Sequence, residues 1–260
     1  MLECRVRRLL GAVALLVSGL PGFDASASCL LRMGWEPYAI YTFADPDGNP
    51  TGVDIDLMKA IAKDVGCEVT FRQLPWARMV LELENGVIDV TSSTSRTPER
   101  ERFAYFSEPY REAEMAVFVR RGEAGNYVLE DLSSIPGADF RLGVIAAYYY
   151  GPEFAELIKD PRFAAQVDGA ADYETNIRKL LHGRIDGILV DDVGVAVGEA
   201  KALGVEDLIE RHPVRVAGDD LHFMFSRKSV NPETYAAFNA RLARMMTDGR
   251  VDEIKARYLE

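Results

Sequence analysis

Apolar and polar residues alternate along the first half of the chain in a way that predicts strands and helices in regular succession. The runs with the length and composition of strands are residues 30–34, 68–72 and 87–90. Apolar residues at helical spacing predict a helix from Asp54, as its N-cap, to Val65, and a second helix over residues 76–86. A strand, a helix and a second strand in this order predict a βαβ unit with parallel strands.

The second half of the chain repeats this succession. Further strand-like runs are residues 114–120, 139–145 and 221–226. Helices are expected over residues 152–159, 173–182, 193–203, 232–247 and 251–258. We therefore expect an α/β fold of two lobes, each a mostly parallel sheet flanked by helices.

Two connections are expected to cross between these lobes, because the last helices return to the first lobe. We assign residues 28–112 and 225–260 to lobe 1, and residues 113–224 to lobe 2. Two crossover strands form a hinge, and closure about a hinge is a common way for a protein to enclose a ligand.

One short pattern occurs twice. Gly-Val-Ile-Asp at 86–89 and Gly-Arg-Ile-Asp at 183–186 each end a helix and lead into an apolar strand. The first copy is followed by a hydroxyl-rich loop at residues 91–95, and the second by Asp191 and Asp192. In open α/β sheets, ligands bind beyond the carboxyl ends of the strands. These two segments are therefore the candidate binding segments of the two lobes.

The hydroxyl-rich loop leads into a helix that carries an arginine. Thr97 is a suitable N-cap, Pro98 suits the first helical position, and Arg100 falls in the first turn. Hydroxyls, backbone N–H groups and a guanidinium in one small volume favour binding of a carboxylate or another small anion. The alternative is an ordinary surface ion pair between Arg100 and Glu99 or Glu108.

The second segment offers carboxylates instead. A site with Arg100 on one lobe and Asp191 on the other would suit a zwitterion. The alternative is that Asp191 or Asp192 only caps the helix that follows. Glu36 could favour a cationic ligand if it faces the cleft, or it could face solvent.

The N-terminus indicates a secretory signal peptide over residues 1–27. Arginines precede an apolar run at residues 9–20, and the small residues of Ala-Ser-Ala at 25–27 provide a cleavage motif. The apolar run is too short to span a bilayer comfortably. We therefore expect export across the inner membrane into the periplasm.

Export into an oxidising compartment changes the interpretation of the cysteines. Cleavage after residue 27 leaves Cys29 and Cys67, each of which lies just ahead of a strand in the same βαβ unit. Adjacent parallel strands would bring them close together, which favours a disulfide. Two separate buried thiols, or a lipid attached to Cys29, are the alternatives.

Composition excludes other classes of function. The 260 residues carry a formal net charge of −11, which argues against nucleic-acid binding because that function needs a basic surface. The histidines have neither metal-ligand spacing nor an evident catalytic partner, and they are His182, His212 and His222. We expect no metal and no cofactor.

Taken in chain order, several stretches resemble the periplasmic solute-binding proteins that serve polar amino-acid ABC transporters. These stretches are Gly-Val-Asp-Ile-Asp-Leu at 52–57, Leu-Glu-Asn-Gly-Val-Ile-Asp at 83–89, Thr-Pro-Glu-Arg at 97–100, Phe-Ser-Glu-Pro-Tyr at 106–110, Gly-Arg-Ile-Asp at 183–186, and Asp191. The resemblance covers essentially the whole mature chain. It implies the two-lobed periplasmic-binding-protein fold of type II, with two crossover strands as the hinge.

The same resemblance implies roles for seven residues. Arg100 would grip the α-carboxylate of a bound amino acid and Asp191 would receive its α-ammonium group. The other positions implied to contact the ligand are Ser93 and Ser95 in the loop, Tyr38 and Trp76 around the ligand side chain, and Tyr149 in lobe 2. At 146–149 the chain has Ala-Ala-Tyr-Tyr where the family often has Gly followed by Thr, which implies a reshaped pocket.

The family also implies partners. A monomeric carrier would deliver its ligand to an ABC transporter permease, without chemistry on the ligand. The competing hypothesis is an enzyme on the same fold, because some relatives are dehydratases that act on carboxylated rings. In that case Glu153 and the neighbouring tyrosines would supply an acid near Arg100.

Overall fold

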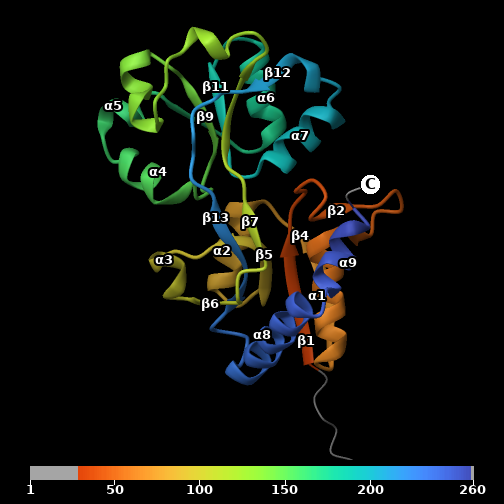
Figure 1. Ribbon diagram of the computed structural model, residues 1–260. Helices are drawn as coiled ribbons and strands as arrows, with labels where there is room; N and C mark the ends of the chain where they lie inside the picture. The colour runs from red at the N-terminus through yellow and green to blue at the C-terminus, as the bar shows by residue number, and fades with distance from the viewer. Residues whose placement is uncertain (1–28, 259–260) are drawn as a thin grey trace, which may run out of the picture.

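The computed structural model describes residues 29–258, which fold into two α/β lobes joined by two crossing segments (Figure 1). The predicted signal peptide at residues 1–27 lies outside the described residues. Within the described range no helix is both long and apolar enough to cross a membrane. The expectation of two α/β lobes is confirmed.

Lobe 1 contains the N-terminal elements and the last strand and helices of the chain. Its elements are β1 (Cys29–Trp35), β2 (Phe43–Ala44), β3 (Pro50–Thr51), α1 (Val53–Asp64), β4 (Cys67–Gln73), α2 (Trp76–Glu84), β5 (Val90–Ser95), α3 (Pro98–Glu101), β6 (Ala104–Phe106), β7 (Arg111–Ala113), β13 (Asp219–Ser226), α8 (Pro232–Thr247) and α9 (Arg250–Ala256). The larger sheet has the order β4-β1-β5-β13-β6, with β7 also paired to β13. Strands β4, β1 and β5 are parallel, and β13 enters antiparallel to β5.

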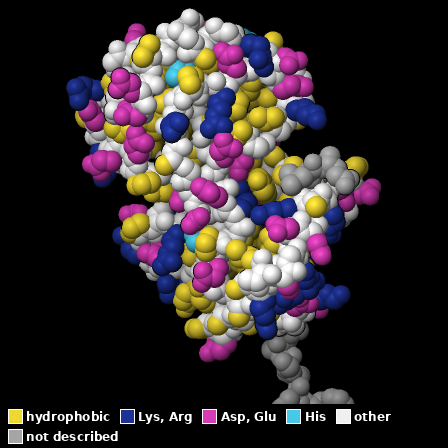
Figure 2. All heavy atoms as spheres, viewed as in Figure 1, with side chains coloured by type: hydrophobic (Ala, Val, Ile, Leu, Met, Phe, Trp, Pro, Cys, Tyr) yellow, Lys and Arg dark blue, Asp and Glu magenta, His cyan; other side chains and the backbone are white. Residues whose placement is uncertain are grey.

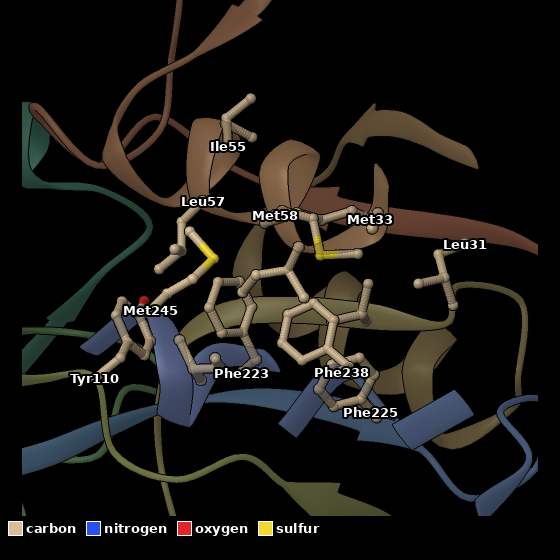
Figure 3. Packing of buried hydrophobic residues seen from close by; sticks show 14 of the residues in the cluster. Leu31, Met33, Ile55, Leu57, Met58, Tyr110, Phe223, Phe225, Phe238 and Met245 are labelled. Atoms are coloured by element: carbon tan, nitrogen blue, oxygen red, sulfur yellow. The ribbon is translucent and has the colours of Figure 1, made fainter. Parts of the chain in front are cut away.

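The main core of lobe 1 lies between this sheet and the helices α1, α8 and α9. Figure 3 shows side chains of β1 and β13 meeting side chains of α1 and α8. Phe223 and Phe225 of β13 pack against Phe238 of α8, with ring centroids 5.2 and 4.8 Å apart. Because β13 and α8 come from the C-terminal part of the chain, the end of the sequence completes the core that its beginning starts.

Lobe 2 is built in the same way. Its elements are β8 (Ala116–Arg120), the 3₁₀ helices η1 (Ala124–Asn126) and η2 (Leu132–Ala138), β9 (Leu142–Ile145), α4 (Gly151–Leu157), α5 (Pro161–Ala164), β10 (Val167–Ala170), α6 (Tyr173–Leu181), β11 (Gly187–Val190), α7 (Val193–Ala202), η3 (Glu206–Leu208) and β12 (Ile209–Arg211). The sheet order is β10-β9-β11-β8-β12. Strands β10, β9 and β11 are parallel, whereas β8 and β12 are antiparallel to their neighbours.

Both sheets are therefore mixed, because β13 in lobe 1 and β8 in lobe 2 run against the parallel βαβ strands. The chain crosses first between β7 and β8 and returns between β12 and β13. One boundary differs from the expected one: β13 pairs with β7 and β5 from Asp219 and Leu221 onwards. Residues 219–224 therefore extend the lobe 1 sheet, because their backbone hydrogen bonds are made with lobe 1 strands.

The repeated Gly-x-Ile-Asp pattern has a structural explanation. Asp89 accepts hydrogen bonds from the backbone N–H of Arg32 at 2.8 Å and from its guanidinium at 2.7 Å. Asp186 accepts the same set from Arg141 in lobe 2, at 2.8 to 2.9 Å. In each copy the arginine also donates to the carbonyl of the helix-ending glycine. In each lobe the aspartate and glycine of the repeat thus hold the arginine of the neighbouring chain segment against the end of the helix. The candidate ligand-binding residues follow the repeat in the chain.

The expected disulfide is confirmed. Cys29 and Cys67 are directly paired at the start of the parallel strands β1 and β4, with Cα atoms 4.4 Å apart, and their sulfurs are bonded. A lipid thioether would need the same sulfur of Cys29, so the disulfide excludes that alternative for this form of the protein. Figure 2 shows acidic and basic side chains interspersed over both lobes on the visible face, without a basic stripe.

Candidate ligand-binding cleft between the lobes

A cleft lies between the two lobes and contains about 580 Å³ of space, part of which is open to solvent. All seven residues that the sequence indicated for ligand contact line it, namely Tyr38, Trp76, Ser93, Ser95, Arg100, Tyr149 and Asp191. Ten further residues complete the lining: Trp35, Glu36, Thr42, Met79, Thr91, Ser92, Ala113, Met115, Tyr148 and Leu221. The lining combines aromatic rings, hydroxyls and three charged side chains, which is the composition of a site for a small polar molecule.

Arg100 is the cation of the cleft. It lies in the short helix α3, whose N-cap is Thr97 as expected, and Thr97 Oγ1 accepts the backbone N–H of Arg100 at 3.3 Å. Its Nη1 donates to the carbonyl of Ser95 at 2.9 Å, and its guanidinium lies 5.1 Å from the ring centroid of Trp76. Within residues 29–258, Arg100 forms no ion pair with a carboxylate, whereas Glu101 in the same helix pairs with Arg96.

Arg100 is partly buried without an ion-pair partner among residues 29–258, and this burial changes the pKa of its guanidinium. Burial lowers the pKa of Arg100 to about 10, an effect that the charge of Asp219 partly offsets. The group stays protonated at neutral pH, since that value is still well above 7. An unpaired, partly desolvated guanidinium is costly unless an anion binds to it. The ordinary surface pairs with Glu99 or Glu108 are not formed.

The hydroxyl-rich segment is a strand, so the expectation of a loop after a strand at 87–90 is wrong. Strand β5 runs from Val90 to Ser95 and pairs with β13 on one side and with β1 on the other. Threonine suits strands because its side chain is branched at Cβ, and the return of β13 supplies an antiparallel partner that the sequence did not reveal. A register irregularity between His222 and Met224 of β13 lies opposite the middle of this segment.

Ser93 sits at that irregularity in an unusual conformation. Its φ is 54°, in the left-handed region that non-glycine residues seldom occupy. Its backbone N–H donates to the hydroxyl of Tyr110 at 3.0 Å, and its Oγ donates to Asp54 at 2.6 Å. The hydroxyl of Ser93 is therefore engaged inside the protein, at the floor of the cleft.

Asp54 itself departs from expectation. The N-cap of α1 is Gly52, and the side chain of Asp54 makes no cap hydrogen bond. Asp54 is instead completely buried and accepts hydrogen bonds from Ser93 and from the Tyr110 hydroxyl at 2.7 Å. Its position inside the first turn of α1, facing β5, explains why it serves the sheet rather than the helix end.

The two neighbouring aspartates of lobe 2 have different contacts. Asp192 caps α7, because its Oδ1 accepts the backbone N–H groups of Gly194 and Val195 at 2.9 and 3.3 Å. Asp191 does not cap the helix; it lines the cleft and accepts hydrogen bonds from Tyr38, at 2.8 Å, and from Tyr173. Burial raises the pKa of Asp191, while the two tyrosine hydroxyls oppose that rise.

Aromatic residues connect the lobes across the cleft. Tyr38 reaches from lobe 1 to Asp191 and packs in the core cluster of lobe 2. Trp76 Nε1 donates to the carbonyl of Ala147 at 3.0 Å, and its ring meets that of Tyr148 edge to face, with centroids 6.0 Å apart. Tyr149 is half-buried in the lining. Tyr148 and Tyr149 therefore narrow the cleft from the lobe 2 side, whereas Tyr150 is buried in the core of lobe 2.

Glu36 was expected to face either the cleft or solvent, and in the structure it faces the cleft. It directly follows β1, at the carboxyl end of a central parallel strand. Its carboxylate accepts the Tyr148 hydroxyl at 2.7 Å and the Trp76 backbone N–H at 2.9 Å. Burial raises its pKa, and the hydrogen bond from Tyr148 acts in the opposite direction. The cleft thus has two carboxylates, Glu36 and Asp191, for one guanidinium.

Other residues near the cleft were not indicated by the sequence. Arg111 and Tyr173 each contact a cleft residue or the network beneath it. Tyr148, which donates to Glu36, belongs to the Ala-Ala-Tyr-Tyr stretch that was expected to reshape the pocket. Arg111 begins β7 between a tyrosine and a glutamate, and no apolar pattern in this segment marks it as buried. No local pattern marks Tyr173, which is brought to Asp191 by the packing of α6 beside β11.

The histidines and Glu153 do not belong to the described lining of the cleft. Among residues 29–258, no cluster of three or more His, Cys, Asp or Glu side chains is arranged to hold a metal ion. His212 and His222 are buried and bonded to backbone groups. Glu153, the candidate acid of the enzyme hypothesis, is exposed on α4 and does not line the cleft.

Comparison with known proteins agrees with this architecture. The family described as bacterial extracellular solute-binding proteins, family 3, matches residues 31–260, and the chain belongs to this family. The L-cystine-binding protein TcyJ of Escherichia coli (strain K12) is 25% identical over 227 residues, which cover 85% of this chain and 79% of TcyJ.

Solved structures of similar proteins have the same fold. An ancestral arginine-binding protein bound to arginine has a TM-score of 0.74 and 27% identity, covering 89% of this chain and 98% of its own. An ancestral amino acid-binding protein, described as a precursor of cyclohexadienyl dehydratase, has a TM-score of 0.71 and 26% identity, covering 89% and 96%. The chain is therefore similar to binding proteins on a fold that has also given rise to an enzyme.

Proposed function

We propose that this extracytoplasmic solute-binding protein captures an L-amino acid in the cleft and delivers it, as a periplasmic monomer, to the permease of an ABC transporter. The observation that carries the proposal is the unpaired guanidinium of Arg100, which shares one cleft with the carboxylate of Asp191. An α-carboxylate would form a bidentate pair with Arg100. An α-ammonium group would neutralise Asp191 on the opposite lobe.

The charges of the cleft favour a cationic side chain on that amino acid. The lining carries Arg100 against Glu36 and Asp191, and the two charged ends of an amino acid would balance only Arg100 and Asp191. Glu36 would remain a partly buried carboxylate without a counter-charge, which is unfavourable. A ligand such as arginine or lysine supplies the missing positive charge. The similar ancestral protein bound to arginine agrees with this charge balance.

Binding without chemistry is the function that the lining supports. The only two carboxylic acids of the described lining, Glu36 and Asp191, are both held by hydroxyl or N–H donors. We infer that these groups hold charges and do not transfer protons to the ligand. Incubation of the protein with cyclic carboxylic acids is expected to yield no product, and turnover that is abolished by Glu36→Gln would contradict this inference.

The proposal is tested by ligand screening of the mature chain, residues 28–260. A ligand that binds only the native state raises Tm as its concentration passes its Kd. L-Arginine and L-lysine are expected to raise Tm more than neutral amino acids, and acidic amino acids least. Stabilisation by carboxylates without an amine, or no stabilisation by any amino acid, would reject the proposal.

Two variants with one control assign the contacts. Arg100→Met is expected to weaken binding of every amino acid by about 10²-fold or more, because it removes the only cation among the described lining residues. Arg102→Met is the matched control, since Arg102 is exposed and lies two residues away. Glu36→Gln should weaken L-arginine binding at least tenfold and leave neutral amino acids nearly unchanged. Equal losses for cationic and neutral ligands would reject the role of Glu36.

A further inference from the structure

Beneath the cleft lies a buried charged residue that does not touch the space for the ligand. Arg111 begins β7, next to the first crossing between the lobes, and its side chain is only 4% exposed. Its Nη1 forms an ion pair with Asp192 of lobe 2 at 2.6 Å. Its Nη2 donates to Ser93 Oγ of lobe 1 at 2.8 Å. One guanidinium therefore joins the two lobes below the cleft.

Each hydrogen-bonding partner of Arg111 lies in the cleft lining or next to a residue of it. Asp192 is the N-cap residue that fixes the start of α7. Asp191, which faces the cleft, is the residue directly before it in the chain. Ser93 lies in β5, two residues before Ser95, whose carbonyl holds the guanidinium of Arg100. The bridge from Arg111 thus ends beside the anchor for the carboxylate on one side and beside the anchor for the ammonium group on the other.

The rest of the network fixes the guanidinium in place. The guanidinium lies 3.6 Å from the ring centroid of Tyr41, a stacking and cation–π contact. Ser93 and the Tyr110 hydroxyl both bond to Asp54, so the lobe 1 end is held by a buried carboxylate. Arg111 does not belong to the lining of the cleft, and neither does Asp192.

A buried arginine is an unusual choice for this position. Hydrophobic residues of the same volume generally stabilise a protein as well as a buried ion pair does, so stability alone does not explain Arg111. An ion pair between lobes has a further property, because it favours whichever arrangement of the lobes brings its partners together. A protein that closes around a ligand binds more weakly when the closed arrangement is less populated.

We infer that Arg111 is a positioning residue that couples closure of the lobes to ligand binding: its ion pair with Asp192, together with its bond to Ser93, holds the two anchors of the site at their closed separation. This inference rests on the proposed function. It predicts that loss of the guanidinium opens the lobes and weakens binding, although no contact with the ligand is removed.

The test compares Arg111→Met with Arg120→Met. Arg120 is also largely buried, at 20% exposure, and bonds to the carbonyls of Leu180 and Ile185, but all its partners lie within lobe 2. Both variants are expected to have a lower Tm. Only Arg111→Met should weaken the binding of L-arginine, by about 10- to 100-fold, as measured by calorimetry. Arg111→Lys should restore part of the affinity, because it keeps the charge opposite Asp192.

A distance measurement separates closure from general damage. Spin labels at Val87→Cys in lobe 1 and Val128→Cys in lobe 2 occupy exposed positions. Pulsed electron–electron double resonance should show longer distances between the labels in Arg111→Met than in the parent protein, both without ligand and with L-arginine. The distances in Arg120→Met should be unchanged. If Arg111→Met does not fold, Asp192→Asn replaces it, since the amide oxygen can still cap α7.

Each result decides the inference. It is overturned if Arg111→Met lowers Tm but leaves the distances and the L-arginine affinity within twofold of the parent protein. If the parent protein does not bind L-arginine, the proposed ligand class fails, and the distances measured without ligand then decide the role of Arg111. A shift toward longer distances supports the inference, and identical distributions overturn it.

Discussion

Asp191 and Asp192 are adjacent in the chain, yet replacing each by asparagine should have opposite main effects. Asp191 faces the cleft and accepts two tyrosine hydroxyls. In Asp191→Asn the amide oxygen can still accept one hydroxyl and the amide N–H can donate to the other tyrosine oxygen, whose own proton then loses its acceptor. The cost of this lost acceptor is offset because the buried negative charge is removed. Burial raises the pKa of Asp191, because desolvation disfavours its charged form. Asp191→Asn should therefore leave the free energy of unfolding within about 1 kcal/mol of the parent, or raise it.

The effect of Asp191→Asn on binding should be large. An ammonium group enclosed in the cleft would lose its charged partner, and removing one partner of a buried ion pair costs about 3–5 kcal/mol. This corresponds to a loss of affinity of about 10²- to 10³-fold. Calorimetry with L-arginine or L-lysine measures it directly.

Asp192→Asn should act mainly on stability. The ion pair between Asp192 and Arg111 is buried, with side-chain exposures of 6% and 4%. The amide oxygen keeps the cap on Gly194, but the charge of Arg111 is left without its ion-pair partner, at a cost of about 3–5 kcal/mol. Unfolding in urea, followed by tryptophan fluorescence, should show a clearly lower midpoint, and the loss of affinity should stay below that of Asp191→Asn. An unchanged urea midpoint for Asp192→Asn, or affinity within threefold of the parent for Asp191→Asn, would refute this division of roles.

Three further predictions concern the disulfide, the pH dependence of binding and the contact between lobes at Trp76. Replacing Cys29 and Cys67 by serine should lower the free energy of unfolding by up to about 4 kcal/mol, since the bond closes a loop with a sequence separation of 38 residues; a change below about 1 kcal/mol in urea unfolding would contradict this. A bound cation should lower the raised pKa values of Asp191 and Glu36, so binding of L-arginine should release protons. The affinity for L-arginine should therefore fall as pH decreases toward the ordinary carboxyl range, at about 4. Calorimetry in buffers of different ionisation enthalpy checks the sign of the proton release, and tighter binding at lower pH would refute the prediction. Trp76→Phe removes the bond to the Ala147 carbonyl but keeps an aromatic ring, and should weaken binding about 3- to 10-fold through faster ligand release; stopped-flow fluorescence showing an unchanged dissociation rate would contradict it.

The sequence predicted the elements of this fold well where local signals determine them. Helix α8 was expected over 232–247 and occurs as Pro232–Thr247, because Asn231 and Pro232 give a clear start. Prediction from the sequence failed where pairing with a strand distant in the chain determines the local structure. Residues 91–95 have no apolar alternation, and they form a strand only because β13 returns from the far end of the chain to pair with them.

The candidate site follows the same division. Arg100 and Asp191 were predicted from their charges, from their positions beyond the ends of strands and from the family resemblance. Glu36 has the same signal, as the residue after β1, but only packing shows that its carboxylate points into the cleft. Arg111 and Tyr173 depend on contacts between elements that are far apart in sequence, so no local pattern could assign their partners.

Tyrosine hydroxyls explain how the cleft can keep two carboxylates ready for a ligand. Tyr38 and Tyr173 donate to Asp191, and Tyr148 donates to Glu36. Burial raises the pKa of all three tyrosines well above its ordinary value, so they remain donors at any pH that the protein meets. Each carboxylate oxygen has a second lone pair, so a cationic ligand can add its own hydrogen bonds without displacing these donors. The ligand then supplies the one thing that the hydroxyls do not, which is positive charge.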